Sequence, residues 1–110
     1  MTTTVEKQVL IKARALIADP DHWTRSVLAR NAEGQSVHWC DPSATKWCAV
    51  GAIYRSAYEL VGNEKEATRI GDDVARRVAP IWVWRSLMTI NDIRGHAAVL
   101  AKFDRALADG

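Results

Sequence analysis

Residues 46–62 read KWCAVGAIYRSAYELVG. Residues 47–54 are apolar on nearly every side of a helix, and such a helix lies in the interior of a domain. Gly51 costs helix stability there but lets a neighbouring backbone come close. Gly62 is well placed to end the helix, because glycine readily takes the left-handed conformation found after helix C-termini. The sequence therefore predicts a buried central helix that opens after residues 41–43.

Amphipathic patterns predict three further helices around this one. Residues 4–18 carry an apolar stripe with charged side chains on the other faces, and the helix stops before Pro20. Residues 64–78 follow Asn63, which resembles the first residue of a capping box. Residues 96–108 repeat the helical spacing of apolar side chains. These helices can cover the central one.

The remaining segments are less regular. Two short runs rich in β-forming residues flank a turn in which Gly34 can take a positive φ, so we expect strands near residues 26–30 and 36–40. Residues 81–90 fit an extended run or a short helix almost equally. A turn at residues 91–92 then leads into the last helix.

These patterns together predict a mainly α fold. We expect a compact, orthogonal domain of four to five helices with one short β-hairpin over about residues 26–40. At 110 residues, a division into two parts would leave cores too small to be stable, so residues 1–110 should form a single globular domain.

Composition narrows the possible functions. The apolar fraction of 48% and charged fraction of 25% exclude a disordered chain. No apolar stretch approaches the ~20 residues that span a bilayer, and the N-terminus lacks the layout of a signal peptide, so we expect no membrane partner and a cytoplasmic location with reduced cysteines.

Charge makes nucleic acid an unlikely partner. The net charge is only +2, whereas nucleic-acid binders concentrate basic residues more strongly. A local excess of six basic over two acidic residues lies between positions 76 and 105. A solvated helix surface explains it best, and a weak nucleic-acid-binding module is the alternative. That alternative would use Arg76, Arg77, Arg85 and Arg94.

Cysteine and histidine residues could in principle bind zinc. The candidate ligands are His38, Cys40, Cys48 and His96, with His22 as a substitute for the last. The usual knuckle spacing of two residues between cysteines is missing, so two buried cysteines and an exposed histidine are the favoured interpretation. We therefore expect no metal and no cofactor.

A thiol-dependent enzyme is a second chemical alternative. Cys48 lies near the start of the central helix, where the helix dipole could favour a thiolate. His96 could act as its base, with Asp92 or Asn91 as the group that orients the imidazole. Residues 49–52 beside the thiol are strongly apolar, however, which favours an inert buried cysteine and no catalytic residue at all.

Tryptophan is abundant, with five in 110 residues. Trp82, Trp84 and Arg85 lie close together, and these two residue types dominate the energetics of protein–protein interfaces. We therefore take these three residues as a candidate partner-binding patch, for another protein or for self-association. Closure of the hydrophobic core explains the two tryptophans equally well.

Three motifs resemble those of an uncharacterised family of short bacterial and phage domains. They are the W-C-A-x-G-A run at residues 47–52, the Asn91-Asp92 pair, and the V-L-x-x-F-D-R-A run at residues 99–106. The resemblance implies a compact, α-rich fold and an occurrence that includes mobile elements, and it implies no activity. Together with the candidate patch, it leads us to expect a small non-enzymatic protein-binding domain, an accessory or inhibitory factor linked to phage or mobile elements.

Overall fold

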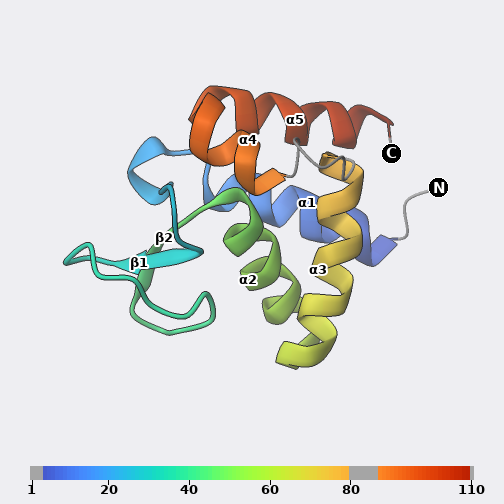
Figure 1. The fold of residues 1–110 in the computed structure, drawn as a ribbon. Coiled ribbons are helices and arrows are strands. Elements are labelled where there is room, and N and C mark those ends of the chain that lie inside the picture. The colour runs from blue at the N-terminus through green and yellow to red at the C-terminus, as the bar shows by residue number, and fades with distance from the viewer. Residues whose placement is uncertain (1–3, 80–86, 110) are drawn as a thin grey trace.

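The helix α2 (Ala49–Val61) lies at the centre of the fold in a computed structural model that describes residues 4–79 and 87–109. It packs against α1 (Thr4–Leu16), α3 (Glu64–Val78) and α4 (Leu87–Arg94). The last helix, α5 (His96–Asp109), contacts α1, α3 and α4. Figure 1 shows α1 and α5 running across the view and α2 and α3 along its height. The predicted mainly α fold is therefore confirmed.

The helix boundaries follow from local chemistry. Asn63 caps α3, because its Oδ1 accepts a hydrogen bond from the Glu66 N–H at 2.9 Å. Gly62 ends α2 with φ +70°, as predicted from its conformational freedom. The predicted range of α3 is confirmed, whereas α1 ends at Leu16, two residues earlier than expected.

The small sheet corrects the predicted hairpin. Strand β1 (Ala29–Asn31) pairs antiparallel with β2 (Ala44–Trp47), with Ala29 opposite Trp47. The prediction of a second strand at residues 36–40 was wrong, although a single bridge joins Arg30 to Ser36. The turn itself is confirmed, because Gly34 has φ +82°.

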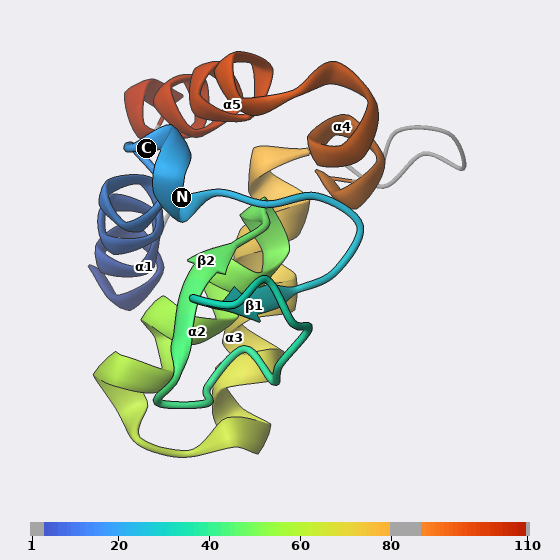
Figure 2. The ribbon, with the colours of Figure 1, turned by 90° about the vertical axis from the view of Figure 1, so that its left-hand side faces the viewer.

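The second strand lies where the sequence predicted the start of the central helix. Pairing with β1 holds residues 44–47 extended, and Cys48 is also extended, with ψ 175°. The helix therefore begins only at Ala49. Figure 2 shows the loop between the two strands beside the lower ends of α2 and α3.

Gly51 allows the close backbone approach that the sequence predicted. A Cβ atom at this position would lie 2.0 Å from the carbonyl oxygen of Leu28. The same oxygen accepts a hydrogen bond from the Cys48 N–H at 3.2 Å. The segment before β1 therefore contacts the first turn of α2 directly, and only glycine fits at position 51.

The Asn91-Asp92 pair does not form the predicted turn. Both residues lie inside α4, and the break before α5 falls at Gly95, which has φ +92°. Residues 87–90, unassigned from the sequence, are helical. The remainder of the unassigned stretch, including Trp82, Trp84 and Arg85, lies outside the described residues. Among the described helices, none is long and apolar enough to cross a membrane.

Candidate functional site

Two of the three motifs of the sequence, residues 47–52 and the Asn91-Asp92 pair, meet at a buried junction. The side-chain oxygen of Asn91 accepts hydrogen bonds from the Ala49 N–H at 2.9 Å and from Trp23 Nε1 at 2.6 Å. The amide nitrogen of Asn91 donates to the Thr24 carbonyl at 3.0 Å. One buried side chain thus accepts a hydrogen bond from the first N–H of α2 and joins this helix to α4 and to the segment before β1. Its role is therefore to hold these segments together.

Cys48 is part of the same junction. Its side chain is only 1% exposed, and Sγ accepts a hydrogen bond from the Gly51 N–H at 3.3 Å, so the residue is the N-cap of α2. Burial raises the pKa of this thiol, although hydrogen bonds from the Gly51 and Val50 N–H groups act in the opposite direction. A buried thiol with a raised pKa stays protonated and is a poor nucleophile.

His96 and Asp92 make separate structural contacts. His96 Nε2 lies 2.6 Å from the Ile17 carbonyl oxygen, and its ring lies against Trp23 with 5.4 Å between the centroids. Asp92 accepts a hydrogen bond from the Ser26 N–H at 2.9 Å, which supports the positive φ of 72° at Ser26. No hydrogen bond joins either side chain to the Cys48 thiol in the part of the chain that the structure describes.

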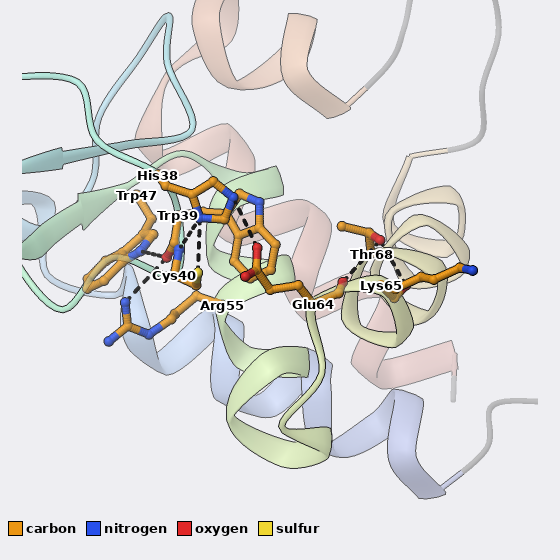
Figure 3. Close-up of polar contacts among 8 residues, drawn as sticks. All are labelled: His38, Trp39, Cys40, Trp47, Arg55, Glu64, Lys65 and Thr68. Carbon is orange, nitrogen blue, oxygen red and sulfur yellow. Dashed lines mark hydrogen bonds and ion pairs between the residues drawn. The ribbon is translucent and has the colours of Figure 1, made fainter.

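A second group of polar side chains lies on the surface. Cys40 Sγ lies 3.0 Å from His38 Nδ1, and His38 Nε2 lies 3.3 Å from a Glu64 carboxylate oxygen. One possible ligand atom from each of the three residues lies within 4.8 Å of the others. Figure 3 shows the imidazole between the thiol and the carboxylate. We call these three residues the His38–Cys40–Glu64 cluster.

The loop that carries His38 and Cys40 is anchored on α2. Trp39, between them, is buried against Tyr54 and Tyr58. Its carbonyl oxygen accepts hydrogen bonds from Trp47 Nε1 at 3.2 Å and from the Arg55 guanidinium at 3.3 Å. The Arg55 guanidinium also binds the Asp41 carbonyl at 3.1 Å. These contacts fix the backbone on both sides of the two side chains, as Figure 3 shows for the Trp39 carbonyl.

Glu64 comes from a different element. It is the first residue of α3, where a carboxylate interacts favourably with the helix dipole. Desolvation and the Glu64 charge raise the pKa of the Cys40 thiol. The cluster therefore brings together a thiol, an imidazole and a carboxylate, the three side-chain types that bind zinc in proteins.

The structure selects two of the four residues considered as zinc ligands. His38 and Cys40 come together, whereas Cys48 and His96 belong to the buried junction. The sequence analysis missed Glu64, because it lies 26 positions from His38 and has an ordinary local role as a first-turn acidic residue. The only signal in the sequence was the position of Glu64 at the start of a predicted helix.

A third feature is apolar. On α4, Ile93 is 75% exposed and Met88 is 39% exposed. Met88 also borders a groove of about 330 Å³ between α2, α3 and α4, which Val50, Ala75 and Leu87 line. We define the α4 surface as the three exposed residues of this helix, Met88, Ile93 and Arg94. This helix directly follows the candidate patch of the sequence analysis.

The fold defines a small, mainly α protein with a short antiparallel sheet. The chain belongs to a family described as a family of unknown function (DUF6197), whose match covers residues 1–109. Neither a curated protein nor a solved structure matches it.

Proposed function

We propose that this chain is a non-enzymatic binding protein that contacts a different protein through the α4 surface, together with Trp82, Trp84 and Arg85. The observation that carries this proposal is the 75% exposure of Ile93 on a helix of only eight residues. A large aliphatic side chain gains free energy when a partner removes it from water. Met88 adds apolar area on the same short helix.

The charges of α4 and α5 indicate what kind of partner fits. Asp92 binds the Ser26 N–H, and Asp104 is paired with Arg14 at 2.8 Å. On the α4 surface, Arg94 has no ion pair with any residue that the structure describes. A partner whose apolar patch lies beside an acidic residue would complement this surface. We also propose that the chain acts in the cytoplasm as an accessory or inhibitory factor linked to phage or mobile elements.

The two other candidate functions have weaker support. Cys48 is a buried cap with a raised pKa, so a thiol enzyme centred on it has no geometric basis. Two of the four arginines considered for nucleic-acid binding are already in ion pairs, Arg76 with Asp73 and Arg77 with Glu6. Phosphate recognition also gives no role to an exposed Ile93. Protein binding uses both the apolar and the basic residues.

Site-specific photo-crosslinking in the native host tests the proposal. A photoreactive residue at position 93 should give a defined adduct with one other protein, and the double variant W82A/W84A should remove it. The same residue at Ile11, an exposed aliphatic position on α1, is the matched control. Equal adducts at both positions would contradict the α4 surface. An adduct with the mass of two copies would show that the α4 surface serves self-association and not the binding of a different protein.

The fold of the double variant must be checked in the same experiment. We expect its far-ultraviolet circular dichroism and its thermal midpoint to match those of the unchanged chain. Loss of the helical signal would show that Trp82 and Trp84 close the core, and the candidate patch would then be wrong.

A further inference from the structure

We propose that His38, Cys40 and Glu64 bind a divalent transition-metal ion of the zinc class, with a fourth position left open to solvent. The geometry carries this inference, because one donor atom from each side chain lies within 4.8 Å of the other two. Sulfur, imidazole nitrogen and carboxylate oxygen form a mixed donor set that suits zinc better than calcium or magnesium, which prefer oxygen alone.

The distances require only small movements. Zinc bonds of about 2.3 Å to sulfur and about 2.1 Å to nitrogen place those two atoms about 3.6 Å apart in a tetrahedron. Cys40 Sγ and His38 Nδ1 are 3.0 Å apart, so they need to separate by about 0.6 Å. Glu64 needs to turn its carboxylate from Nε2 toward the ion, and its side chain is 56% exposed and has room to turn.

The protonation states are compatible with metal binding. His38 Nδ1 accepts a hydrogen bond from the Cys40 N–H at 3.1 Å, so its lone pair already faces the cysteine. Binding exchanges this hydrogen bond for the metal–nitrogen bond, and the Cys40 thiol releases its proton to solvent as the metal–sulfur bond forms. A divalent cation also offsets the repulsion between a Cys40 thiolate and the Glu64 carboxylate.

The anchored loop makes the cluster a prepared site. Trp39 is buried, and hydrogen bonds from Trp47 and Arg55 fix its carbonyl, so the backbone between the two loop ligands has little freedom left to lose. Glu64 lies on the first turn of α3, whose cap is formed by Asn63. A bound ion would therefore link the loop between the strands to α3.

A cysteine nucleophile activated by His38 is the rival interpretation of the same cluster. It requires a thiol whose pKa is lowered, whereas the surroundings of Cys40 raise it. The Glu64 carboxylate contributes to that rise, which opposes thiolate formation unless a cation is present. The donor set and its charge therefore fit a metal ion better than a free nucleophile.

Cobalt(II) titration of the untagged full-length chain tests the proposal, with a phosphine reductant in place of thiol reductants. We expect one equivalent of cobalt to produce a thiolate-to-metal charge-transfer band, and zinc to displace it. C40S should abolish the band, and H38Q and E64Q should each weaken binding about tenfold or more. The matched controls H22Q and E33Q replace exposed residues outside the cluster and should bind like the unchanged chain.

Absence of a thiolate band in the unchanged chain would overturn the proposal, as would a band that survives C40S. Equal weakening by the controls would show unspecific surface binding and would also overturn it. Circular dichroism of each variant shows that it is folded. Zinc should also raise the thermal midpoint of the unchanged chain and leave that of C40S unchanged. These results are independent of the α4 surface, which shares no residue with the cluster.

Discussion

The two cysteines lie eight positions apart, and their surroundings differ in almost every respect. Cys48 is buried at the start of α2, and its sulfur accepts a hydrogen bond from the Gly51 N–H. Cys40 is half-buried on a loop, and its sulfur lies beside an exposed imidazole. In the first region the polar groups are used to join helices. In the second they converge at the surface, where a ligand can reach them.

A chemically reactive residue type therefore does not by itself mark a functional site. Cys48 and Asn91 belong to the most distinctive motifs of the sequence, yet both are committed to hydrogen bonds that hold α2 in place. Cys40 and Glu64 attract less notice in the sequence, and the fold brings them together. Substitutions in the junction should therefore change stability, whereas substitutions in the cluster should change binding.

Asn91→Ala should have the largest effect on stability. It would leave the Ala49 N–H, Trp23 Nε1 and the Thr24 carbonyl without their partner in a buried environment, so the free energy of unfolding should fall by about 4 kcal/mol. Urea denaturation followed by circular dichroism measures this change. Asn63→Ala removes only an exposed cap and should cost about 1 kcal/mol. Equal losses in the two variants would contradict the role of the junction.

Gly51→Ala should come next. Its Cβ would meet the Leu28 carbonyl oxygen, so the segment before β1 must move away from α2, at a cost of about 3 kcal/mol. Gly34→Ala provides a comparison, because no atom lies within 4 Å of a Cβ there and only the positive φ is strained, which costs about 1 kcal/mol. The difference between the two midpoints in urea isolates the steric effect, and its absence would refute the close approach.

Cys48→Ala and Cys40→Ala compare the two regions directly. The first removes a buried cap and leaves a small void, so we expect a loss of about 2 kcal/mol. The second should change the free energy of unfolding by about 0.5 kcal/mol or less in the absence of metal, because the side chain is only partly buried and caps no helix. Thermal unfolding in the presence of a chelator provides both values. A larger loss of stability for Cys40→Ala than for Cys48→Ala would contradict the assignment of Cys48 to the scaffold and of Cys40 to the binding site.

Ser56→Ala should have a small effect of the opposite sign. The Ser56 hydroxyl is buried in α2 and has no hydrogen-bond partner among the described residues. Its removal should therefore raise the free energy of unfolding by about 1 kcal/mol or leave it unchanged. Destabilisation in the same urea experiment would mean that the hydroxyl has a partner in solution.

Local patterns predicted the helices well and the pairings badly. The cap at Asn63, the stop at Gly62 and the buried face of α2 depend on neighbours in sequence, and each is confirmed. The second strand depends on a partner across a loop, and residues 44–47 have no strong preference of their own. A four-residue segment takes the conformation that its tertiary contacts favour.

The cluster shows the same limit. His38 and Cys40 were both candidate zinc ligands from the sequence, and their side chains are neighbours in the structure, on a loop rather than on the predicted strand. The approach of Glu64 depends on the path of the loop toward α3, which no local pattern encodes. Asn91 was likewise assigned to a turn, because its partners at Trp23 and Ala49 are distant in sequence.

Alkylation of the two thiols in the native protein tests the division into scaffold and site most directly. We expect one maleimide adduct per chain under reducing, metal-free conditions, with peptide mapping that places it on Cys40, and labelling of Cys48 only after unfolding in denaturant. Rapid labelling of Cys48 in the folded chain would contradict the account, because its thiol would then be accessible rather than enclosed at the start of α2.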